Sequence, residues 1–138
     1  TWSAYWYNGA IVSSEITRGL DIFELAPSAF ISQNEIDAAK TVHFDYYNTQ
    51  DQQKFVWPAS FALARAYLDQ LERSNGLAPA RISTVRQELS AAEGRSTSVR
   101  RKALTSLATR LDADASHSSD TSRVRALSAA VRSLAAGS

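Results

Sequence analysis

Four segments in the second half of the chain repeat apolar residues at alternating spacings of three and four, and this pattern constrains the fold most. Such spacing places the apolar side chains on one face of an α-helix. Turn signals separate the segments: Asn75-Gly76 is a natural helix stop, whereas Pro79 and Asp120 are natural helix starts. Because short links favour antiparallel neighbours, residues 58–138 are expected to form an up-and-down bundle of about four helices.

The apolar stripes identify the expected core of this bundle. They are Phe61, Ala64, Leu68 and Leu71 in a helix from Pro58; Ile82, Val85, Leu89 and Ala92 in a helix ending at Gly94; Leu104, Leu107 and Leu111 within residues 98–112; and Val124, Leu127, Val131 and Leu134. Each stripe is one face wide, which predicts a packed core that holds no cofactor.

The front of the chain has the pattern of β-strands. Asn8-Gly9 favours a type I′ hairpin turn, because both of its central residues need a positive φ. A second turn is expected at residues 17–19, and Ala26-Pro27 closes the third strand because proline lacks an amide donor. Strands are thus predicted at residues 4–7, 10–16 and 20–25. Residues 1–26 should form a small antiparallel β-meander, and the chain is predicted to have an α+β fold.

Residues 27–57 link the meander to the bundle. Ser32 and Glu35 have the spacing of a capping box, which predicts a helix from there to about Val42. Residues 43–55 are polar and aromatic without a clear period, and we predict an irregular connector. Its rings have two interpretations: they pack the sheet against the bundle, or they form a binding surface.

A three-stranded sheet cannot cover both of its faces, so its apolar residues require a partner surface from the helices, from further chain or from another protein. We therefore predict a partner-binding surface on the strands, the connector and the basic start of the third bundle helix. Its candidate residues are Trp2, Tyr5, Trp6, Tyr7, Phe44, Tyr46, Tyr47, Trp57, Arg100 and Arg101.

The net charge of the chain changes sign between residues 57 and 58, where the bundle is expected to begin. Residues 1–57 hold three basic and seven acidic residues, a net charge of −4, whereas residues 58–138 hold twelve basic and seven acidic residues, a net charge of +5. A basic helical half is most simply a solvated face, although acidic protein surfaces would be attracted to it. No stacking aromatic residues interleave with the basic ones, so we expect no nucleic-acid partner.

The front residues also resemble a known family. The run Trp2–Leu25, which contains YWYNG, SE and RGLD, resembles the last blade of bacterial LVIVD-repeat proteins, which are exported β-propellers. The stretch that includes Trp57-Pro58 and Ala64–Leu71 is similar to the helical tail that follows the propeller in some of them. The resemblance implies an exported protein, periplasmic, secreted or at the cell surface, with an N-terminal propeller region missing from this chain. It implies no catalytic residue.

Evidence for catalysis or metal binding is weak. Asp112, Asp114, His117 and Asp120 lie within nine residues, but their spacing matches no calcium loop, and we interpret them as helix caps in a solvated segment. His43 near Asp45 has the residue types of an oriented general base, yet adjacent positions alone establish nothing. The chain has no cysteine and no phosphate-binding or nucleophile motif. We expect no catalytic, cofactor or metal site.

Three hypotheses about function follow. The first is a non-catalytic interaction or scaffold module of an exported bacterial protein, which docks through its sheet and aromatic connector. The second is an accessory structural subunit of a large membrane-associated complex, in peripheral contact with it, since no apolar run reaches the length of about 20 residues needed to span a bilayer. The third is an enzyme or metal-binding protein that uses His43, His117 or residues 112–120.

Overall fold

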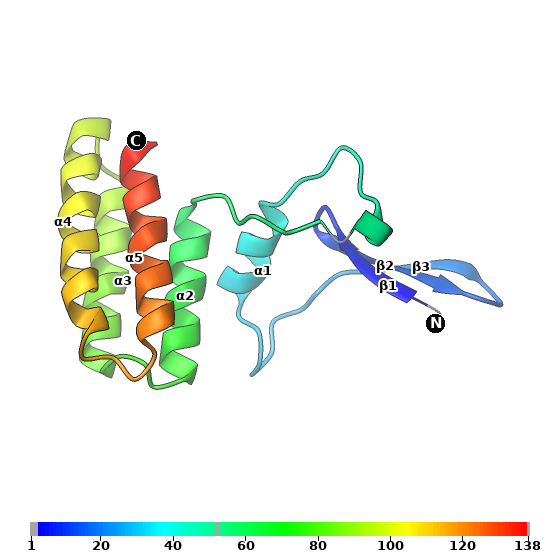
Figure 1. Cartoon of the computed structure of the whole chain (residues 1–138), viewed down its shortest axis with the longest axis horizontal. Helices are drawn as coiled ribbons and strands as arrows, with labels where there is room; N and C mark the ends of the chain where they lie inside the picture. The colour runs from blue at the N-terminus through cyan, green and yellow to red at the C-terminus, as the bar shows by residue number, and fades with distance from the viewer. Residues whose placement is uncertain (1–2, 52, 138) are drawn as a thin grey trace. The chain divides into compact units, whose positions relative to one another are not determined.

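The computed structural model describes residues 3–51 and 53–137 and confirms the α+β fold (Figure 1). A three-stranded antiparallel meander is followed by five α-helices in the described part of the chain. The chain divides into two compact units, a front unit of residues 1–58 and a helical unit of residues 59–138.

The meander of the front unit follows from its turns. Strands β1 (Ser3–Tyr7), β2 (Ala10–Glu15) and β3 (Gly19–Phe23) pair in the order β1-β2-β3. Asn8 and Gly9 have φ values of 46° and 94°, as the predicted type I′ turn requires. The third strand ends two residues before the predicted Leu25.

Helix α1 (Gln33–Lys40) begins with the predicted capping box. The amide of Glu35 donates to Ser32 Oγ at 3.2 Å, and the amide of Ser32 donates to Glu35 Oε2 at 2.7 Å. The helix ends two residues earlier than predicted, and Thr41 is its C-terminal cap. The irregular connector extends past the predicted residue 55 and is defined as residues 43–57. A short 3-10 helix, η1 (Thr49–Asp51), interrupts it, and its described part otherwise contains no helix or strand.

The helical unit consists of α2 (Phe61–Arg73), α3 (Pro79–Glu93), α4 (Thr97–Ala115) and α5 (Thr121–Ala136). Each helix packs on the next in sequence, and α5 packs on α2, so the four close into a bundle (Figure 1). The expected helix start at Pro58 was wrong, because Ser60 Oγ accepts a hydrogen bond from the amide of Leu63 and caps α2 there.

The apolar stripes form the core of this bundle. Its fully buried large side chains come from all four helices: Leu68, Leu71, Ile82, Val85, Leu89, Leu104, Leu107, Leu111, Val124, Leu127 and Val131. Helices α4 and α5 make the most extensive contact, because small buried residues such as Ala108 and Ser128 let the two helices approach closely. No helix among the described residues has the length and apolar character needed to cross a membrane.

Candidate protein-docking site

The register of the meander separates its side chains into two faces. Tyr5 lies opposite Val12, and Val12 lies opposite Ile22, so these three side chains cross one face of the sheet. Tyr7 and Leu20 belong to the same face, which we call the tyrosine face. Tyr5 is 42% exposed, Leu20 58% and Ile22 65%. This face therefore presents apolar side chains that the described chain leaves uncovered.

The opposite face carries Trp6, Ile11, Ser13 and Phe23. Trp6 is half-buried, Ser13 is buried, and the indole nitrogen of Trp6 and the hydroxyl of Ser13 have no hydrogen-bond partner in residues 3–51 and 53–137. Phe23 is half exposed at the edge of the sheet. The strand alternation thus places Trp6 on the other side of the sheet from Tyr5 and Tyr7.

Asn8 holds the connector onto the hairpin. Its side-chain amide donates from Nδ2 to the carbonyl of Phe44 at 2.9 Å and accepts at Oδ1 from the amide of Phe44 at 2.8 Å. The hydroxyl of Tyr7 donates to the same carbonyl at 3.1 Å. Asn8 is suited to this role because asparagine tolerates the left-handed conformation of the turn and also has both a donor and an acceptor. The turn residue therefore fixes the backbone of the connector.

Five rings form an aromatic cluster around this attachment. Their centroids lie 5.3 to 6.4 Å apart in successive pairs, in stacked, tilted and edge-on arrangements typical of packed aromatic side chains. The members are Tyr7, Phe44, Tyr47, Phe55 and Trp57. Within the front unit, the connector rings thus pack on one another and on the end of β1.

A pocket of about 370 Å³ opens between the tyrosine face and the connector. The sheet contributes Tyr5, Tyr7 and Val12 to its wall. The connector contributes Asp45, Tyr46, Tyr47 and Thr49. The carboxylate of Asp45 is exposed and forms no hydrogen bond or ion pair with another described residue. The pocket therefore combines four tyrosines with an uncompensated negative charge.

The predicted partner-binding residues fall in several places. Four of them line the pocket (Tyr5, Tyr7, Tyr46 and Tyr47), two belong to the aromatic cluster without lining the pocket (Phe44 and Trp57), and two lie in the helical unit (Arg100 and Arg101). Trp6 lies on the opposite face of the sheet, and Trp2 lies outside the described residues. Sequence reasoning did not select Asn8, Val12, Asp45, Leu20 or Ile22 as site residues. The strand register set by the Asn8-Gly9 turn was the signal that could have identified Val12 and Ile22.

The side chain of Arg100 forms hydrogen bonds with backbone carbonyls at and just after the end of α3. Its guanidinium donates to the carbonyls of Glu93 at 3.0 Å and Arg95 at 3.1 Å, and it lies 3.4 Å from that of Ala92. The carbonyls of Ala92 and Glu93 belong to the C-terminal end of α3, where a positive charge is favourable, and that of Arg95 follows the helix. A basic residue at the start of α4 is therefore stabilised by the neighbouring helix end, and Arg100 has a structural role in the bundle.

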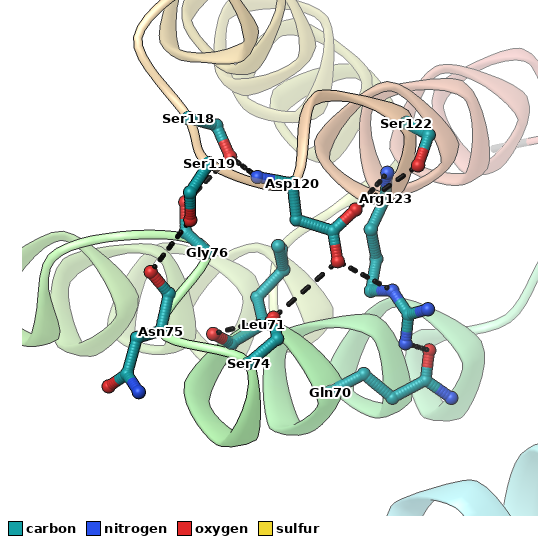
Figure 2. A network of polar contacts seen from close by, with 10 residues as sticks. All are labelled: Gln70, Leu71, Ser74, Asn75, Gly76, Ser118, Ser119, Asp120, Ser122 and Arg123. Carbon is teal, nitrogen blue, oxygen red and sulfur yellow. Dashed lines mark hydrogen bonds and ion pairs between the residues drawn. The ribbon is translucent and has the colours of Figure 1, made fainter.

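Asp120 and its neighbours join two loops at one end of the bundle (Figure 2). Asp120 Oδ1 caps α5 by accepting from the amide of Arg123 at 3.2 Å. Ser118 Oγ donates to the carbonyl of Gly76 at 2.6 Å, and Ser119 Oγ donates to that of Asn75 at 3.1 Å. Asp120 is thus a helix cap, as predicted. The rest of the prediction was wrong, because α4 continues past the expected end at Asp112 to Ala115, so Asp112 and Asp114 lie within a helix.

Two of the acidic candidates for metal chemistry are engaged by other side chains of the bundle. Asp114 forms an ion pair with Arg81 at 2.8 Å, and Asp112 contacts Ser128 and Arg132. No group of three or more histidine or acidic side chains in the described chain is arranged to hold a metal ion. No protein-family model, curated protein or solved structure matches this chain.

Proposed function

We propose that this chain is a non-catalytic docking module, which binds a protein partner through the tyrosine face and the connector of its front unit. The observation that carries this proposal is the exposure of Tyr5, Leu20 and Ile22 on one face of a small sheet, next to a tyrosine-lined pocket. Contiguous exposed apolar side chains mark interaction surfaces, and tyrosine is enriched at them. The resemblance of residues 2–25 to LVIVD-repeat proteins supports an exported, bacterial setting.

The proposal is tested by capture from cells that produce the protein. The full chain is incubated with an extract, and bound proteins are cross-linked through lysines and identified by mass spectrometry. The chain has three lysines: Lys40 and Lys54 in the front unit, and Lys102 in the helical unit. We expect cross-links to one partner from Lys40 or Lys54. A partner cross-linked through Lys102 alone would contradict the proposal.

A pair of variants tests the surface itself. Leu20→Ser combined with Ile22→Ser removes exposed apolar area from the tyrosine face, and we expect it to abolish capture of that partner. Val99→Ser is the matched control, because Val99 is a half-exposed apolar residue on α4. Both variants should keep the circular dichroism spectrum of the native chain. Equal capture by the two variants would show that the tyrosine face is not the docking surface.

A further inference from the structure

The pocket between β1, β2 and the connector has the chemistry of a cation site. Its wall includes Tyr5, Tyr7, Tyr46 and Tyr47, and the negative face of an aromatic ring attracts a cation placed over it. Asp45 adds a carboxylate whose charge no described residue neutralises. Residues 1–57 carry a net charge of −4, so the surroundings also favour a positively charged ligand.

The structure also fixes part of this wall in advance. The hydroxyl of Tyr7 is bound to the carbonyl of Phe44, and the ring of Tyr7 stacks on that of Tyr47 with centroids 6.4 Å apart. The two hydrogen bonds from the side chain of Asn8 fix the backbone of Phe44, which precedes Asp45. Rings that are held before binding lose little entropy when a ligand enters.

We propose that this pocket binds an arginine side chain of the protein partner. The inference rests on the docking function proposed above and specifies the group that the partner inserts. A guanidinium is planar, stacks on aromatic rings, and forms two parallel hydrogen bonds to one carboxylate, whereas an ammonium is a compact and strongly hydrated charge. A pocket with four tyrosines and one free carboxylate therefore suits arginine better than lysine or a quaternary ammonium ion.

Short peptides test the inference without a known partner. N-acetyl-Gly-Arg-Gly-amide is titrated into the full chain. Binding is followed by NMR, from the chemical shifts of the backbone amides of Tyr5, Asp45 and Tyr47. Citrulline in place of arginine keeps the shape and removes the charge. We expect the arginine peptide to bind at least about tenfold more tightly than the citrulline peptide, because a cation over aromatic rings and a charge-assisted hydrogen bond are both lost. A third peptide has lysine in place of arginine, and its affinity should lie between those of the arginine and citrulline peptides.

Two substitutions locate the interaction. Asp45→Asn removes the charge in the pocket, and we expect it to reduce the preference for arginine over citrulline by about tenfold or to abolish it. Asp51→Asn is the matched control, because Asp51 is an exposed acid of the same connector that does not line the pocket. If the two variants behave alike, only the general charge of the front unit matters and the inference is wrong.

The other outcomes are equally decisive. Equal affinity for the arginine and citrulline peptides, or shifts confined to the helical unit, would overturn the inference. Choline tests a small free cation as the alternative ligand, and choline binding as tight as that of the arginine peptide would also overturn it. If the peptide fails while Leu20→Ser with Ile22→Ser still abolishes partner capture, the docking function stands and the inference alone fails. If the peptide binds but that variant captures normally, the docking proposal fails.

Discussion

The two units of this chain treat their apolar residues in opposite ways. The helical unit buries its stripes, and the side chains of Leu68, Leu89 and Leu127 have no exposed surface. The front unit leaves Leu20 and Ile22 on its sheet more than half exposed. Burial of apolar surface is the main favourable term in folding, so the bundle is stabilised by its own packing. A sheet with uncovered apolar residues gains further stability only from something that covers them.

This contrast supports the docking function proposed above. A surface that is costly to leave in water and is absent from the bundle is better explained by binding than by folding. Asp45 also differs from three acidic residues of the helical unit. Asp112, Asp114 and Asp120 in the helical unit are engaged by Ser128, Arg81 and Arg123, whereas Asp45 in the front unit has no partner in the described chain.

The largest expected effect comes from removing core side chains of the bundle. Leu107→Ala or Leu127→Ala should lower the free energy of unfolding by about 2 to 5 kcal/mol, because each leaves a cavity among buried neighbours. Ile22→Ala on the tyrosine face should cost less than about 0.5 kcal/mol, as is usual for exposed positions. Urea unfolding followed by helical circular dichroism measures all three. A loss below about 0.5 kcal/mol for Leu127→Ala would disprove the bundle register.

The sequence predicted the bundle well because its signals are local and mutually consistent. Periodic leucines, Pro79 at the start of α3 and Asp120 at the start of α5 each act within one helical turn of their own position. The start of α2 differs from the prediction because a proline at the first turn is a weaker signal than the serine cap that Ser60 provides.

The next largest effect is expected from removing the two hydrogen bonds that join the Asn8 side chain to the backbone of Phe44. Asn8→Gly keeps the freedom to adopt a positive φ but removes both hydrogen bonds to Phe44, and we expect the front unit to lose about 1 to 3 kcal/mol. The amide of Phe44 should exchange hydrogen faster by a corresponding factor. Asn75→Gly is the control in the bundle, because Asn75 also has a positive φ, 53°, but its side chain makes no such pair of hydrogen bonds. Equal effects of the two variants would show that only the turn conformation matters.

The candidate site was harder to predict than the fold, because it depends on contacts between distant residues. The aromatic character of the strands and the connector predicts Tyr5, Tyr7, Tyr46 and Tyr47 as site residues, and these four line one pocket. Asn8 and Phe44 are 36 residues apart, and no spacing rule connects a hairpin turn to an irregular connector. Asp45 was considered only as a neighbour of His43, whereas its place in the pocket depends on the path of the connector over the sheet.

A smaller effect tests whether Arg100 serves the fold or a partner. Arg100→Ala should destabilise the bundle by about 0.5 to 1.5 kcal/mol, because the carbonyls of Glu93 and Arg95 lose a charged donor. Lys102→Ala is the control, since Lys102 is an exposed neighbour on the same helix. Thermal unfolding of the two variants compares them. An unchanged unfolding temperature for Arg100→Ala would show that Arg100 does not stabilise the bundle, and a role in partner binding would again be the better interpretation.

The smallest effect is a pH dependence that belongs to the bundle alone. The hydroxyl of Ser128, together with Arg132, lowers the pKa of Asp112 from its ordinary value. A carboxyl whose folded pKa lies below its unfolded value of about 3.9 contributes stability above that pH, and the contribution disappears as the pH falls through the folded pKa. Asp112→Asn should therefore cost less than about 1 kcal/mol near neutral pH, because the group is half exposed and screened by solvent. Urea unfolding of the variant and the native chain should converge in acid, and a difference that grew with acidity would mean that Asp112 opposes folding.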